Sequence, residues 1–219
     1  MERDAAAASA EYLAQFRTDV ESFISREAVE ACISLSVHER SPERAHSYIA
    51  FVDPSGGSSD SMTLAIAHTE GKTQILDALR EIKPPFSPEA VVDEFASLIR
   101  SYRCSTVYGD RYGGEWPREQ FQKRGVHYEP AEKAKSDIYR DLLPLINSGA
   151  VDLLDHDRLA LQLTSLERRT SRGGRDSIDH APGAHDDLAN AAAGALVTAF
   201  REPGVVFRGP LKLPQLGIA

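Results

Sequence analysis

Tyr48-Ile49-Ala50-Phe51-Val52-Asp53-Pro54 is the stretch that decides the fold, because an unbroken apolar run ends abruptly at an aspartate and a proline. Such a run predicts a strand that is buried on both faces of a sheet. Two further strands are expected at Met62–His68 and Thr73–Ile82, joined by the tight turn Glu70-Gly71-Lys72. We therefore expect a sheet in which an antiparallel hairpin follows the first strand.

Helices and shorter strands are expected after this unit. Ser87-Pro88 places an N-cap residue and a proline at the start of a helix. Ser105–Tyr108 predicts a fourth strand that stops at Gly109-Asp110. The remaining expected elements are a helix at 115–123, a strand at 126–128, helices at 136–146 and 155–166, an arginine-rich hairpin at 167–179 and an alanine-rich helix at 186–200. This order predicts an α/β fold with a mixed β-sheet flanked by helices.

The chain divides into three parts by pattern. Residues 1–45 carry apolar residues at helical spacing and predict a helical connector. Residues 46–200 contain the expected sheet and its helices. Residues 201–219 hold three prolines and three glycines and predict an extended C-terminal tail.

Composition narrows the functional classes. The 219 residues suffice for one sizeable domain, and no apolar run approaches the roughly 20 residues that a membrane span needs. The N-terminus does not resemble a signal peptide, and two distant cysteines, Cys32 and Cys104, favour a reducing compartment. The net charge of −8 argues against tight DNA binding by phosphate contacts alone. The net charge does not exclude an enzyme whose carboxylates hold divalent cations, because the metal reverses the local sign of charge.

Three acidic positions lie where secondary elements end or begin. Asp53 closes the first strand, Asp110 follows the fourth, and Asp186-Asp187 opens the last helix. Pairing of the first strand with the fourth would bring Asp53 and Asp110 together at one sheet edge. An all-oxygen cluster suits two Mg²⁺ or Mn²⁺ ions, which favour phosphodiester hydrolysis. The alternative is that these aspartates only form turns and a helix cap.

Several segments resemble a known family. They are Phe51-Val52-Asp53-Pro54-Ser55-Gly56-Gly57-Ser58-Ser59-Asp60-Ser61, Val107-Tyr108-Gly109-Asp110-Arg111-Tyr112-Gly113-Gly114, Lys133–Tyr139, Leu142–Gly149, and Pro182-Gly183-Ala184-His185-Asp186-Asp187-Leu188-Ala189-Asn190-Ala191. Together they resemble the nuclease domain of tailed-bacteriophage large terminases, which has a ribonuclease H-like fold. The resemblance covers roughly residues 10–200 and rests on three acidic motifs in order.

The resemblance implies roles for these residues. Asp53, Asp110 and Asp187 match the family's catalytic metal ligands. Asp186 is a further candidate ligand, but two successive helical residues cannot both face one metal, and the family's usual order of His, any residue, Asp favours Asp187. His185 is auxiliary, and Asp60 lies near the metals or only in the glycine-rich turn.

The implied activity is a metal-dependent endonuclease that cleaves concatemeric double-stranded phage DNA during genome packaging. The implied setting is the cytoplasm of a bacterial host, and the implied partners are a packaging ATPase domain, a portal and a small terminase subunit. No membrane partner is expected, and the chain is expected to be monomeric in isolation. No G-x-x-x-x-G-K-[ST] motif occurs, so packaging-motor activity is not expected of this polypeptide, which is either part of a longer protein or a stand-alone relative.

Basic side chains near the acidic motifs are candidate DNA contacts. They are Lys133, Lys135, Arg168, Arg169, Arg172 and Arg175. For the arginines, a solvated hairpin whose charges offset nearby acids is an equal alternative. Two other functions stay open: a junction-resolving or RNA–DNA hybrid nuclease of the same fold, and a non-catalytic module that docks on a portal or capsid.

Overall fold

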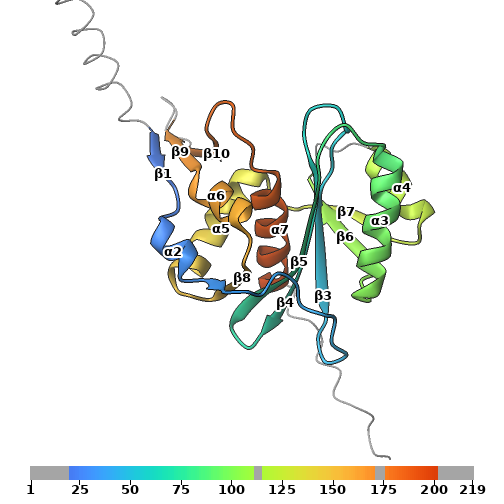
Figure 1. Cartoon of the computed structure of the whole chain (residues 1–219), viewed down its shortest axis with the longest axis horizontal. Helices are drawn as coiled ribbons and strands as arrows, with labels where there is room; N and C mark the ends of the chain where they lie inside the picture. Colours follow the sequence, from blue (N-terminus) through green and yellow to red (C-terminus); the bar gives the residue numbers. More distant parts are fainter. Residues whose placement is uncertain (1–19, 111–114, 171–175, 202–219) are drawn as a thin grey trace, which may run out of the picture.

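The computed structural model describes residues 20–110, 115–170 and 176–201. Within these ranges the main sheet has seven strands in the order β2-β8-β5-β4-β3-β6-β7, and a small sheet has the order β1-β9-β10 (Figure 1). The main strands are β2 (Ile33–Ser34), β3 (Tyr48–Asp53), β4 (Met62–Glu70), β5 (Thr73–Ile82), β6 (Thr106–Gly109), β7 (His127–Pro130) and β8 (Val151–Leu154). The pairings that β4 makes with β3 and β5 are antiparallel, and the other pairings of this sheet are parallel. The predicted mixed sheet is confirmed.

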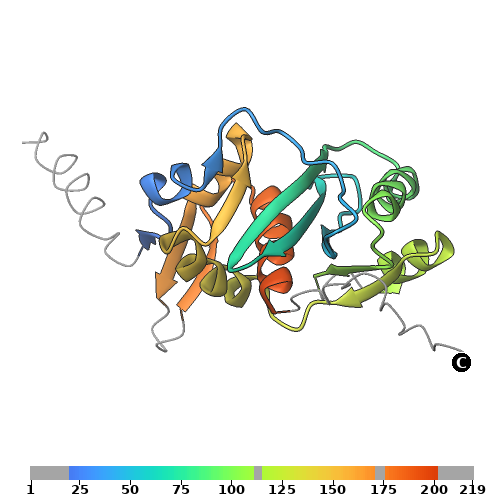
Figure 2. The same ribbon diagram turned by 90° about the horizontal axis from the view of Figure 1, so that it is seen from below.

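Helices cover both faces of the sheet (Figures 1 and 2). One face packs against α3 (Pro88–Ser101) and α4 (Glu115–Lys123), and the other against α5 (Lys135–Asn147), α6 (Asp157–Thr164) and α7 (Asp187–Arg201). Strand β3 serves both cores by alternation: Ala50 and Val52 belong to the α3 side, and Phe51 belongs to the α7 side. None of the helices in the described ranges is long and apolar enough to cross a membrane.

The segment before β3 differs from the expected helical connector. Among residues 20–45, only α2 (Arg26–Glu30) is α-helical, whereas β1 (Val20–Ser22) pairs with β9 (Leu166–Thr170). Phe23 and Ile24 are buried in the α7-side core. Their helix-like spacing was misleading because this segment satisfies its backbone and apolar groups against β9 instead of within a helix. Residues 1–19 and 202–219 lie outside the described residues, so the rest of the connector and the tail stay predictions.

Two short strands also escaped prediction. Strand β8 has only four residues directly after the turn at Gly149, and β2 has two. Both extend the sheet beyond β5. The arginine-rich hairpin is confirmed as β9 and β10 (Asp176–His180), although its expected Gly-Gly turn lies outside the described residues.

Helix α7 lies very close to β3. A Cβ atom added to Gly194 would lie 2.5 Å from the ring of Phe51, which is 1% exposed. Glycine at this helical position therefore permits the close approach of helix and strand. The same approach brings the start of α7 to the end of β3, where Asp53 lies.

Replacement of Gly194 by alanine should destabilise the fold, although alanine normally favours a helix by about 1 kcal/mol. The new methyl group would overlap the buried Phe51 ring, so we expect a loss of about 1–3 kcal/mol and a lower Tm in thermal unfolding. Thr198→Ala in the same helix is the control, since it removes atoms and adds none. A Gly194→Ala variant as stable as the wild type would contradict this packing.

Candidate functional site

Parallel pairing of β3 with β6 brings two of the predicted acidic residues to one sheet edge. Val52 of β3 is opposite Gly109 of β6, so the next residues, Asp53 and Asp110, leave the two neighbouring strands side by side. Neighbouring strands lie about 4.7–4.9 Å apart. The expected pairing of the first strand with the fourth is confirmed.

The backbone at Asp110 is held by a residue from β7. The Tyr128 hydroxyl donates a hydrogen bond of 2.9 Å to the Asp110 carbonyl oxygen. A Cβ atom on Gly109 would lie 2.8 Å from carbons of the Tyr128 ring, so glycine lets this ring pass over the end of β6. Tyr128 thus fixes where the chain leaves β6.

The first two turns of α7 bring further polar groups to this edge. Asp187 and Asn190 are three residues apart and share a helix face. Thr63 of β4 donates from its hydroxyl to the Asp187 carbonyl oxygen at 2.7 Å, and Asn190 donates from its amide to Asp53 Oδ2 at 2.8 Å. Asn190 was not predicted as a site residue, although it is a buried amide in an otherwise small and apolar stretch, which was the available signal.

Asp186 and Asp187 have different surroundings. The Asp186 carboxylate accepts a hydrogen bond from the Tyr139 hydroxyl at 2.8 Å and lies 3.0 Å from Lys135 Nζ. Both partners come from α5. Asp187, the first residue of α7, lies beside Thr63 of β4 instead, because its carbonyl oxygen accepts the Thr63 hydrogen bond. Asp186 is therefore bound to α5, whereas Asp187 lies near the ends of the strands.

Burial and like charges destabilise the ionised form of Asp53. Its pKa is raised to about 7, first by desolvation and then by the charges of Asp187, Asp110 and Asp186, against a lowering effect of the Asn190 hydrogen bond. The pKa of Asp187 is also raised, chiefly by desolvation. These effects mark a site where negative charge is concentrated and incompletely compensated.

Two buried oxygens at this edge have no hydrogen-bond partner among the described residues. They are Asp187 Oδ2 and Asn190 Oδ1. Unpaired buried oxygens beside desolvated carboxylates are what a bound hard cation would satisfy. The donor set therefore fits Mg²⁺ or Mn²⁺. The three predicted aspartates do not, however, form a group whose ligand atoms all lie within 4.8 Å, as the described residues Asp179, His180 and Asp186 do.

Glu81 of β5 is a further carboxylate that the sequence did not indicate. Thr63 of β4 is paired with Glu81 on β5 and with Asp53 on β3, so the two carboxylates lie on either side of the same β4 residue. Glu81 Oε1 accepts from the Ser61 hydroxyl at 2.9 Å and lies 3.0 Å from Arg158 Nη2. Glu81 also raises the pKa of Asp187, whose largest cause is desolvation. Glu81 thus adds negative charge at this edge while Arg158 offsets part of it.

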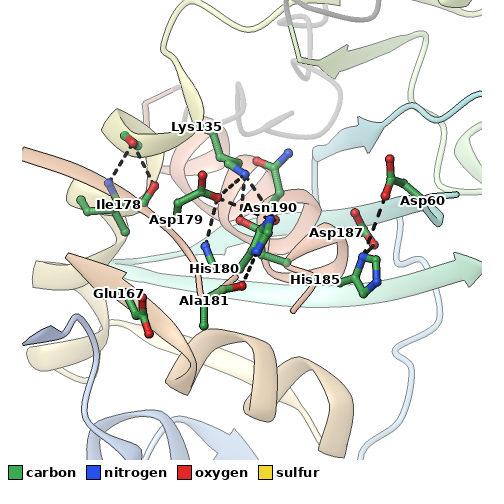
Figure 3. Close-up of polar contacts among 12 residues, drawn as sticks. Asp60, Lys135, Glu167, Ile178, Asp179, His180, Ala181, His185, Asp187 and Asn190 are labelled. Carbon is green, nitrogen blue, oxygen red and sulfur yellow. Dashed lines mark hydrogen bonds and ion pairs between the residues drawn. The ribbon is translucent and has the colours of Figure 1, made fainter. Parts of the chain in front are cut away.

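The auxiliary residues lie at the rim. The His185 side chain is half exposed, and its Nδ1 lies 3.9 Å from both Asp187 Oδ2 and Asp60 Oδ1 (Figure 3). The Asp60 side chain is 63% exposed. The structure therefore places Asp60 beside His185 and not against the buried carboxylates.

The predicted DNA-contacting cations are largely engaged with carboxylates. Lys133 Nζ lies 2.5 Å from Asp141, and Lys135 Nζ lies 2.8 Å from Asp179 as well as near Asp186.

The two described hairpin arginines also have partners. Arg168 stacks over the Phe23 ring at 5.5 Å and lies 3.9 Å from Asp176, whereas Arg169 lies 3.1 Å from Glu167. Arg172 and Arg175 lie outside the described residues. The pairing on Arg168 and Arg169 agrees with the alternative that hairpin charges offset nearby acids.

The raised pKa of Asp53 predicts how stability depends on pH without metal. The Asp53 carboxyl has a pKa of about 7 in the folded protein and about 4 in the unfolded chain. The folded protein therefore becomes less stable as pH rises from about 4 to about 7. In EDTA at pH 8, Asp53→Asn should therefore increase the free energy of unfolding by about 1–2 kcal/mol. For a chain of this length that corresponds to a Tm roughly 2–8 °C above that of the wild type. The difference should shrink toward pH 5, because protonated Asp53 is then neutral as well. A variant less stable than the wild type at pH 8 would rule out this charge effect.

Comparison with known proteins shows similarity in structure. No family model and no curated protein sequence matches the chain. The large terminase nuclease from thermophilic phage G20c is 16% identical with a TM-score of 0.69, over 82% of this chain and 98% of that one. The nuclease domain of the large terminase subunit of bacterial virus Sf6, solved with manganese and β-thujaplicinol, is 16% identical with a TM-score of 0.59, over 82% and 98%.

A longer protein contains the same unit. The HK97 bacteriophage large terminase is 17% identical with a TM-score of 0.62, over 80% of this chain but 44% of that one. The magnesium-bound G20c nuclease is 17% identical with a TM-score of 0.67, over 81% of this chain and 96% of that one. The chain therefore has the ribonuclease H-like fold of phage large-terminase nuclease domains.

Proposed function

We propose that this chain is a divalent-metal-dependent endonuclease that cleaves double-stranded DNA during phage genome packaging. The observation that carries the proposal is the pair of desolvated carboxylates formed by Asp53 at the end of β3 and Asp187 at the start of α7, each of which has a raised pKa. The large terminase nuclease from phage G20c with bound magnesium and the Sf6 nuclease domain with manganese share this fold. Fold alone does not assign chemistry, so the site is the main support.

Asp53, Asp110 and Asp187 are the proposed ligands of two Mg²⁺ or Mn²⁺ ions. When bound, such ions supply an activated water and stabilise the departing oxygen in phosphodiester hydrolysis. Asn190 holds the Asp53 carboxylate in place through its amide. The side-chain oxygen of Asn190, Oδ1, has no hydrogen-bond partner among the described residues.

Asp186 is proposed to position α7 instead of holding metal directly. Burial lowers the pKa of Lys135, but the hydrogen bonds and charges of Asp179 and Asp186 together raise it above its ordinary value, so Lys135 keeps its charge. The Lys135 ammonium group and the Tyr139 hydroxyl, both on α5, therefore bind the Asp186 carboxylate. This arrangement leaves Asp187, on the neighbouring face, as the proposed ligand.

The substrate and the partners follow the terminase likeness. Double-stranded DNA is proposed to bind at this sheet edge. Arg168, Arg169 and Lys133 are candidate phosphate contacts. Each of them would have to exchange its carboxylate partner for a phosphate group. A packaging ATPase domain, a portal and a small terminase subunit are proposed partners, in the cytoplasm of a bacterial host. The burial of Asp53 favours this proposal over a docking module with a vestigial acidic cluster. Desolvation of a carboxylate costs free energy, and a carboxylate without a function would not offset that cost.

A plasmid-nicking assay with single variants tests the proposal. In Mn²⁺ or Mg²⁺, Asp53→Asn and Asp187→Asn should remove activity, because the amide keeps the shape but not the charge. Asp186→Asn should lose less activity, roughly the 10–100-fold seen when a residue that supports a metal ligand is changed, because it loosens the contact of α7 with α5. The matched control is Asp93→Asn, whose exposed carboxylate pairs with Arg124 on the α3 side. EDTA should stop cleavage, and Ca²⁺ should not support it.

Three outcomes would decide against parts of this account. Cleavage at the wild-type rate in EDTA would reject metal dependence. Activity that survives Asp187→Asn but not Asp186→Asn would reverse the assignment of the ligand. Preference for four-way junctions or RNA–DNA hybrids over duplex would favour the other nuclease activities of this fold.

A further inference from the structure

A second group of metal-ligating side chains lies away from the proposed active site. His46 precedes β3, and His68 and Glu70 belong to β4. One ligand atom from each of these residues lies within 4.8 Å of the others. In the β3–β4 register, His68 is opposite Tyr48 whereas Asp53 is opposite Thr63. The two sites are therefore separated by five residues, roughly 17 Å along the strand.

The two sites also lie on opposite faces of the sheet. The His68 ring packs against Tyr48, with centroids 5.3 Å apart, and Tyr48 packs against Tyr102 after α3. Asp53 instead contacts Asn190 of α7. The His46 group thus shares no residue with the proposed nuclease site.

Two of the three separations between ligand atoms match those around a tetrahedral ion, and the third is below 4.8 Å. His46 Nε2 and His68 Nε2 each lie 3.3 Å from Glu70 Oε1. Two ligands bound at about 2.0–2.1 Å in tetrahedral geometry are separated by roughly 3.3–3.4 Å. Histidine and carboxylate ligands in this number are typical of zinc.

A buried carboxylate already orients the His68 ring. His68 is buried, and its Nδ1 lies 2.7 Å from Asp77 Oδ2 on β5. A carboxylate on Nδ1 fixes the tautomer and turns Nε2 toward the metal, as is common for zinc-bound histidines. Asp77 is 1% exposed, so this orientation is held by the core.

The group is also accessible to ions. His46 lines a cavity of about 630 Å³ together with Arg44, Tyr48 and Arg103. The Glu70 side chain is 52% exposed, and Glu43 Oε2 lies 3.7 Å from His46 Nε2 at the rim. Ligand identity, spacing, outer partner and entry path are the properties that a metal site must combine.

We propose that His46, His68 and Glu70 form a zinc-class metal site, with Asp77 as the outer partner of His68. The bound ion would join the segment before β3 to the end of β4. Its fourth position is open to water or to Glu43. This proposal does not depend on the nuclease activity.

Zinc binding to the full chain tests the proposal. The acidic site is first disabled by the double variant Asp53→Asn/Asp187→Asn, so that zinc held there does not interfere. Equilibrium dialysis with elemental analysis should find about one Zn²⁺ per chain, and calorimetry should give its affinity. Adding His46→Ala or Glu70→Gln should weaken that binding by at least about 100-fold, beyond the effect of losing an outer partner.

The matched control is Glu129→Gln, which disrupts an exposed His127–Glu129 pair with a similar separation of 3.4 Å. This control should bind zinc as the double variant does. Glu70→Gln changes an exposed carboxylate, and circular dichroism checks that each variant is folded. Co²⁺ in place of zinc should give the strong visible absorption of tetrahedral coordination, which Glu70→Gln removes. No zinc in the double variant, or binding that His46→Ala and Glu70→Gln leave unchanged, would overturn the proposal.

Discussion

The hydrogen bond from Asn190 to Asp53 is the contact on which the arrangement of the site depends. It joins the first turns of α7 to the last residue of β3 across 137 positions of sequence. The bond forms because Gly194, one helical turn further on, allows the helix to lie directly on Phe51. The same approach brings Asp187 toward the strand ends, beside Thr63. Packing of small residues and placement of carboxylates are therefore one structural feature.

That feature has an electrostatic cost at neutral pH. Asp53 is desolvated and surrounded by carboxylates, which raises its pKa to about 7. A fold tends to retain such a group only where another species supplies the missing positive charge. Lys135 supplies it to Asp186 and Asp179, whereas Asp187 Oδ2 has no hydrogen-bond partner among the described residues. This difference in charge compensation is the reason that Asp187 is the proposed ligand and Asp186 the proposed positioning residue.

Much of this arrangement was predictable from local pattern. The apolar run before Asp53 indicated a buried strand, and the strand before Asp110 indicated its parallel neighbour, both of which the structure confirms. Asn190 and Glu81 were missed because their importance arises only from the register of α7 and β5 against the sheet. Strand β1 was mistaken for helix, since hydrogen bonds to β9 decide its conformation and apolar spacing does not reveal them. The ion pairs that engage Lys133 and Lys135 are likewise tertiary contacts.

The central claim is that the ends of β3, β6 and α7 hold divalent ions through Asp53, Asp110 and Asp187. Anomalous diffraction from crystals soaked in Mn²⁺ tests this most directly. Two peaks roughly 3.5–4 Å apart are expected between these three carboxylates. Manganese bound only at Asp179, His180 and Asp186, or absent from the strand ends at saturating concentration, would contradict it.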